Sequence, residues 1–167
     1  MKSVHRITAI ALSLVLLTLG SVEEKRLEAV VSTGSLELSV EILSTAPVGG
    51  KVVLVNRGSS EIRVWRAGNS WGDETLSFVA IIAGRKQNII RKPQTYTRNV
   101  PASVTLPREG KYEIPFELGD GSWEPAIKKS DVSDTQLEAM YRIVKSNESE
   151  THHVWIGEIH SERIRLR

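Results

Sequence analysis

The sequence KVVLVNRGSSEIRVW, residues 51–65, decides the fold class of this chain. Residues 52–55 form an unbroken aliphatic run, which is typical of a strand buried on both faces. Residues 56–60 favour a turn, because glycine adopts a positive φ and asparagine and serine hydrogen-bond their own backbone. Residues 62–65 then place aliphatic side chains at alternate positions, the period of a strand with one buried face. We therefore expect a hairpin of two strands.

Further short strands are predicted along the rest of the chain. Apolar residues alternate with polar ones, or form short apolar runs, in residues 36–42, 76–83, 111–118 and 137–144. Turn-forming residues recur about every 8 to 12 positions, and no long helical period appears between them. This pattern favours an all-β fold, an antiparallel β-sandwich of about seven to nine strands.

Two aromatic residues indicate the type of sandwich. Trp65 lies on a predicted inner strand and Tyr141 on a late one, where an immunoglobulin-like sandwich places its core aromatics. The sequence contains no cysteine, so it lacks the disulfide of antibody domains. We expect an immunoglobulin-like architecture in which Trp65 is buried.

The first 20 residues have the pattern of an export signal. Two basic residues precede an apolar run at residues 7–19, and Thr18 and Gly20 place small residues at the two positions that signal peptidase reads. Cleavage after Gly20 is therefore predicted, because the run is shorter than the ~20 residues of a spanning helix. Retention as an anchor is the alternative. We expect residues 21–167 to be a single domain, located in the periplasm or outside a bacterial cell.

The charge balance excludes two classes of partner. The chain has 22 basic and 20 acidic residues, and residues 1–20 hold two of the basic ones and no acidic one. Residues 21–167 therefore carry a formal charge of zero. A neutral domain has no electrostatic preference for nucleic acid or for an anionic membrane.

A short motif suggests a serine hydrolase. Residues 68–72, GNSWG, match the G-x-S-x-G pattern that carries the nucleophile of α/β-hydrolases, here Ser70. The acid and base available in the family order are Asp120, Asp131 or Asp134, followed by His152, His153 or His160. That fold needs helices around a parallel sheet, and the sequence predicts none. We therefore expect no catalytic residue. A serine hydrolase that uses Ser70 ranks behind the two functional hypotheses given below.

A histidine-rich segment suggests a metal site. His152 and His153 lie near Glu148, Glu150 and His160. Adjacent residues of a strand point to opposite faces, and eight residues of strand span about 26 Å, so these ligands do not converge. We expect no metal and no cofactor.

Trp71 and Trp123 are the candidate ligand-binding residues. Both lie in polar, glycine-rich segments, and exposed aromatics stack on sugars or anchor a partner protein. The alternative is that each covers the end of the core. We expect a non-catalytic exported binding or structural module, whose partner is an envelope or extracellular protein or a glycan. The sequence specifies neither the ligand nor the oligomeric state.

The alternative to a binding or structural module is a proteinase inhibitor. The segment Arg91–Pro107 contains three prolines and reads as an irregular loop. Its basic residues Arg91, Lys92 and Arg98 would suit a trypsin-like enzyme. Such an inhibitor would present this loop to the protease, since sandwich folds carry recognition on their loops.

Three stretches resemble a class of uncharacterised exported bacterial proteins. They are residues 69–72 (NSWG) followed by 76–78 (LSF), residues 97–101 (TRNVP), and residues 155–157 (WIG) with Ser161. The resemblance implies an immunoglobulin-like sandwich and no activity or cofactor. Residues 56–65 also resemble the corresponding strands of BsuPI-type proteinase inhibitors, although an intracellular inhibitor would not carry an export signal.

Overall fold

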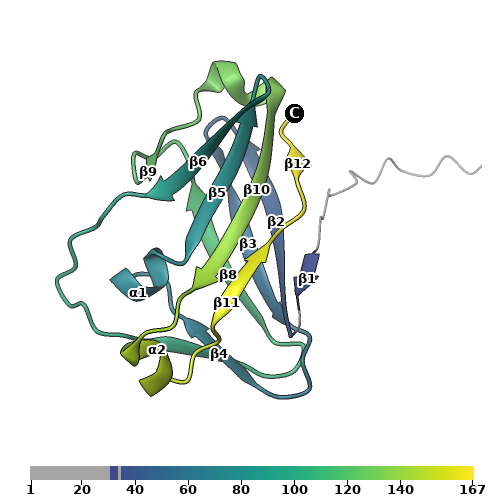
Figure 1. Ribbon diagram of the computed structural model, residues 1–167. Coiled ribbons are helices and arrows are strands. Elements are labelled where there is room, and N and C mark those ends of the chain that lie inside the picture. The colour runs from purple at the N-terminus through teal and green to yellow at the C-terminus, as the bar shows by residue number, and fades with distance from the viewer. Residues whose placement is uncertain (1–30, 34) are drawn as a thin grey trace, which may run out of the picture.

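The computed structural model describes residues 31–33 and 35–167, and the predicted export signal lies outside them. The described residues form an all-β fold of antiparallel sheets (Figure 1). The first sheet contains, in spatial order, β1 (Val31–Thr33), β2 (Leu36–Thr45), β3 (Val48–Asn56) and β8 (Lys111–Glu117). The second contains β11 (Gly157–His160), β10 (Thr135–Ile143), β5 (Leu76–Ile82), β6 (Arg85–Arg91) and β9 (Trp123–Glu124).

The remaining elements are short. β12 (Ile164–Arg165) pairs with β10, and a separate two-stranded sheet joins β4 (Ile62–Trp65) to β7 (Ser103–Leu106). The helices are α1 (Ser70–Asp73), α2 (Asn147–Thr151) and the 3₁₀-helix η1 (Lys129–Asp134). The strands described number twelve, more than predicted, because several are only two or three residues long. Within residues 31–33 and 35–167, no helix is long and apolar enough to cross a membrane.

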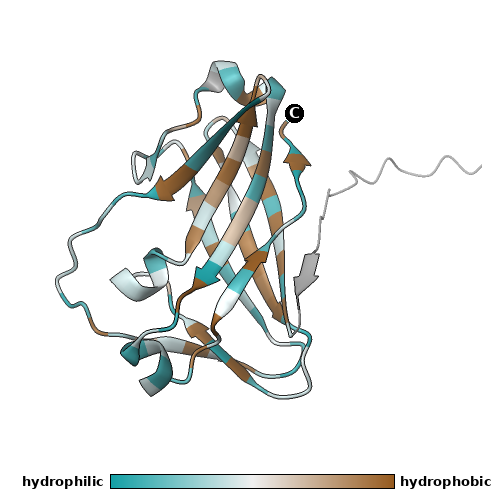
Figure 2. Cartoon of the chain, in the orientation of Figure 1, coloured by the Kyte–Doolittle hydropathy of each residue, from teal (hydrophilic) through white to brown (hydrophobic). Residues whose placement is uncertain are grey.

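The core lies between the two larger sheets. Alternate residues of β2 and β10 point inward, and Figure 2 shows the alternation of hydrophobic and hydrophilic residues along the strands. The buried hydrophobic residues of these two strands are Leu36, Leu38, Val40, Leu137, Ala139, Tyr141 and Ile143. Phe78 of β5 and Phe116 of β8 meet across the core, with ring centres 4.6 Å apart. The predicted alternation is confirmed.

The predicted hairpin at residues 51–65 is wrong, although both of its strands exist. β3 forms its hairpin with β2 and pairs on its other side with β8, whereas β4 pairs with β7. Residues 57–61 therefore lead the chain away from the first sheet. The burial predicted for Trp65 is confirmed, since only 3% of its surface is exposed.

Asn56 explains this change of direction. Its side chain is fully buried, and its Nδ2 donates hydrogen bonds to the carbonyl oxygens of Ser60 (2.8 Å) and Leu106 (2.9 Å). Its Oδ1 accepts a hydrogen bond from the Gly58 backbone (2.9 Å). One amide thus closes the turn after β3 and fixes that turn against the end of β7, 50 residues away.

We expect Asn56→Ala to lower the free energy of unfolding by about 2–3 kcal/mol, because it leaves the buried Leu106 carbonyl without the Asn56 amide and empties the space of a fully buried side chain. The measurement is denaturant unfolding followed by fluorescence. The matched control is Asn88→Ala, an exposed position on β6, which should change stability by less than about 0.5 kcal/mol. Equal effects of the two substitutions would contradict the role assigned to Asn56.

Candidate functional site

The turn after β4 positions Trp71. Asn69 begins α1: its Oδ1 accepts a hydrogen bond from Gly72 N (3.0 Å), and its Nδ2 donates to Arg66 O (3.1 Å). Gly68 has a positive φ of 91°, and a Cβ at Gly72 would overlap the carbonyl oxygen of Arg66. The two glycines of the G-x-S-x-G motif therefore meet needs of the backbone.

Trp71 packs beside the core rather than in it. Its ring centre lies 6.4 Å from that of Trp65, and His152 contacts Trp65 at 5.3 Å. Trp71 itself is half-buried. The candidate ligand-binding residue thus presents part of an indole at the surface, supported from behind by a buried aromatic side chain.

An open depression of about 630 Å³ lies in front of Trp71. Its apolar lining comes from Trp65, Trp71, Ile90, Met140, Ile143 and Val144. Ile90 is 50% exposed and Val144 58% exposed, and they are two of the five large hydrophobic side chains that the described residues expose. Exposed apolar side chains that gather in one place mark interaction sites more often than single ones do.

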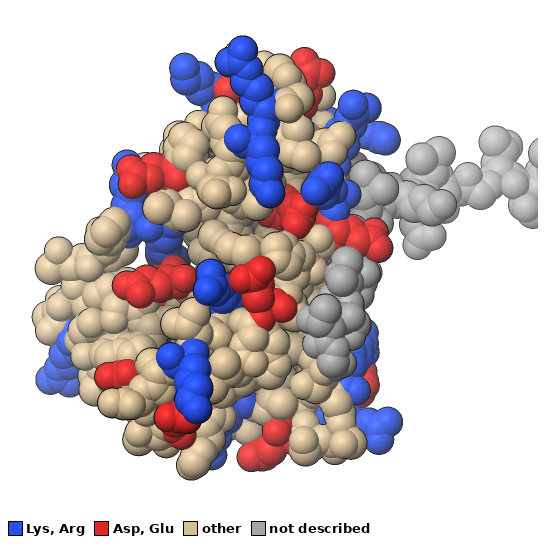
Figure 3. Space-filling view, in the orientation of Figure 1, with Lys and Arg blue, Asp and Glu red and all other residues tan. Residues whose placement is uncertain are grey.

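The border of the depression carries charges of both signs. Glu74 and Glu148 line it together with Arg142, which forms an ion pair with Glu158 (3.5 Å). Figure 3 shows acidic and basic side chains interspersed over this face of the molecule. The depression therefore combines an apolar centre with a mixed, polar border.

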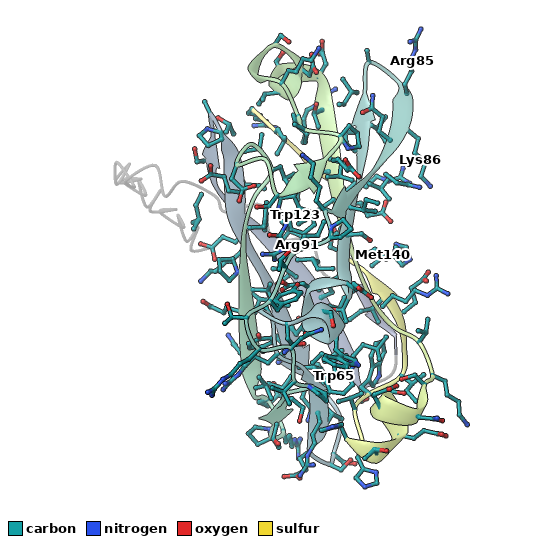
Figure 4. The ribbon with its side chains drawn as sticks, turned by 90° about the vertical axis from the view of Figure 1, so that its left-hand side faces the viewer. Trp65, Arg85, Lys86, Arg91, Trp123 and Met140 are labelled. Atoms are coloured by element: carbon teal, nitrogen blue, oxygen red, sulfur yellow. The ribbon has the colours of Figure 1, made fainter. Side chains whose placement is uncertain are left out.

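The prediction that Trp123 is an exposed recognition residue is wrong. Trp123 lies on β9 with 2% of its surface exposed, and its ring packs edge-on against Phe78 with centres 5.3 Å apart. The guanidinium carbon of Arg91 lies 5.6 Å from the centre of its ring. Figure 4 shows Arg91 beside Trp123, and Trp65 apart from both. The alternative role, covering the core, applies to Trp123.

Ser70 and two of the histidines considered for hydrolysis, His152 and His160, contact other residues and not one another. Ser70 Oγ accepts a hydrogen bond from Asn99 Nδ2 (2.9 Å), an amide that cannot take a proton from it. His160 lies on β11 between two glutamates, and His152 packs against Trp65.

Among the described residues, no group of three or more acidic, histidine or cysteine side chains is placed to hold a metal ion.

His160 belongs to a surface ion-pair cluster. Its Nε2 lies 3.0 Å from Glu158 and its Nδ1 2.8 Å from Glu138, which also accepts from Arg163. The hydrogen bond to Glu158 is the largest cause that raises the pKa of His160, and the bond to Glu138 adds to it against the effect of burial. Burial would raise the pKa of Glu138, but Arg163 and His160 lower it.

No protein-family model, curated protein or solved structure matches this chain. The resemblances suggested by the sequence therefore stay predictions. A fold hosts many functions, so the geometry of the sites is what bears on the function of this chain.

We expect Gly72→Ala to lower the free energy of unfolding by about 3 kcal/mol, because the new methyl group overlaps backbone that cannot move away. Gly68→Ala in the same turn meets open space and should cost only about 1 kcal/mol, for its positive φ. Chemical unfolding of both variants measures the difference. A tolerated Gly72→Ala would refute this structural role.

The contribution of His160 to stability should depend on pH. Because its folded-state pKa is raised, the contribution is complete below the unfolded value of about 6.5 and is lost as pH rises through the folded value. Relative to the wild type, His160→Gln should therefore lose more unfolding free energy at pH 5.5 than at pH 9. His153→Gln, an exposed histidine outside the cluster, is the control. A deficit independent of pH would contradict the assignment.

Proposed function

We propose that the chain is a non-catalytic, exported binding module whose partner is a protein that docks an apolar segment into the Trp71 depression. The observation that carries this proposal is the meeting of half-buried Trp71 with exposed Ile90 and Val144 around one depression. Protein interfaces are enriched in tryptophan, methionine and arginine at their centres, with polar groups at the border. The lining by Trp71, Met140 and Arg142 has this composition.

The strand order supports an immunoglobulin-like sandwich as the scaffold. β2, β3 and β8 lie side by side as strands A, B and E do in that fold, and β11, β10, β5 and β6 follow the order G, F, C and C′. In this correspondence the fully buried Tyr141 lies on strand F, in the core between the two sheets. A rigid scaffold of this type displays recognition surfaces at low entropic cost.

A protein partner suits the depression better than a glycan does. Ile90 and Val144 expose aliphatic side chains, and covering them with apolar groups of a partner favours binding. A sugar would instead place hydroxyl groups against them. The mixed charges at the border give no preference for an acidic or a basic partner.

A photo-crosslinking amino acid at position 144 should capture the partner from the envelope fraction, whereas the same group at Leu43, 66% exposed on β2, should not. With the captured protein purified, Val144→Asp and Ile90→Asp should each weaken binding at least about tenfold. Leu43→Asp, the matched control, should leave the affinity unchanged.

Equal binding by all three variants would refute the depression as the interface. Binding that survives protease treatment of the envelope fraction, but is lost after periodate oxidation of its sugars, would place a glycan in the depression instead of a protein.

A further inference from the structure

The segment 92–102, between β6 and β7, is a long loop fixed at both ends. Lys92 N donates a hydrogen bond to Ser122 O (2.8 Å), and Arg66 N donates to Ala102 O (2.8 Å). Figure 1 shows the loop curving outward past α1. Pro93 and Pro101 further restrict its backbone. The loop is therefore tied to the body of the protein where it leaves and where it returns.

Two side chains also tie the middle of the loop to α1. Tyr96 donates its hydroxyl proton to Asp73 Oδ2 (2.7 Å), and burial, followed by this bond, raises the pKa of Tyr96 to about 12. Asn99 accepts from Ser70 N (3.0 Å) and donates to Ser70 Oγ (2.9 Å). These anchors stand on either side of the peptide bond between Arg98 and Asn99.

Arg98 is the basic residue that this arrangement presents to solvent. Thr97 and Arg98 are exposed between the two anchors, and Val100, just beyond them, is 63% exposed. Arg91 is held instead by Asp73 (3.5 Å) and by the ring of Trp123. Lys92, whose backbone is also fixed, is half-buried. Of the three cations of the predicted inhibitory loop, Arg98 is thus the exposed one.

We propose that residues 97–100 bind the active-site cleft of a trypsin-like serine protease, with Arg98 in its acidic S1 pocket. A guanidinium matches the carboxylate at the base of such a pocket. The ties at both ends and in the middle remove most of the entropy that a free peptide loses on binding. The site is separate from the Trp71 depression and does not depend on its occupant.

The same anchors make the protein an inhibitor rather than a substrate. Attack of the protease serine on the Arg98 carbonyl would form an ester and release the α-amine of Asn99, which takes up the serine proton through the protease histidine. Because Ser70 holds the Asn99 side chain, this amine stays beside the ester. Its return attack reforms the peptide bond and restores the serine hydroxyl.

The test measures inhibition of bovine trypsin on a small fluorogenic substrate by the purified protein. Arg98→Ala should weaken inhibition at least about 100-fold, and Arg98→Lys should retain most of it. Arg98→Phe should transfer inhibition to chymotrypsin, a gain that misfolding cannot produce. Arg108→Ala, an exposed arginine in the turn between β7 and β8, is the control and should inhibit fully.

Asn99→Ala should turn the protein into a substrate, with mass spectrometry showing cleavage after Arg98 at a rate well above that of the wild type. Inhibition unaffected by Arg98→Ala, or rapid cleavage of the wild type after Arg98 without inhibition, would overturn the proposal. Val144→Asp should inhibit trypsin normally, so that failure at the depression and failure at the loop are separate results.

Discussion

The buried amide of Asn56 is the constraint on which the rest of the structure depends. It closes the turn after β3 and joins it to Leu106 at the end of β7, so that β4 leaves the first sheet. β4 then lies beside the segment that precedes β11, where Trp155 N donates to Arg63 O (2.7 Å). This position brings Trp65, and with it the turn that bears Trp71, next to β10.

Local patterns predicted the strands, whereas pairing depended on contacts far apart in sequence. β2 and β10 were predictable because one face of each is buried and their side chains alternate with the period of the strand. The turn chemistry at residues 56–60 indicated a hairpin, and a turn does form there. Its direction is decided by the Asn56–Leu106 hydrogen bond, which no local window contains. β4 therefore pairs with β7 instead of β3.

The candidate site was predictable only in part. Trp71 stood out as an aromatic residue in a polar segment, but Trp123 gave the same signal and is buried by Phe78 and Arg91. The sequence did contain a signal for Ile90 and Val144. Ile90 follows the buried Ile89 near the end of β6, and Val144 follows the buried Ile143 directly after β10. Because neighbouring side chains of a strand face opposite ways, the second residue of each pair points away from the core.

The two proposed sites share one support. α1 has only four residues and would not persist alone, so its position comes from tertiary contacts. Asp73, 6% exposed, supplies several of them by accepting from Gly68 N (2.8 Å) and Tyr96 and by pairing with Arg91. A buried carboxylate is costly unless its partners are in place, so these contacts define a single geometry. That geometry holds the segment 92–102 through Ser70 and Asp73 of α1, and it holds the ring of Trp71 beside Trp65.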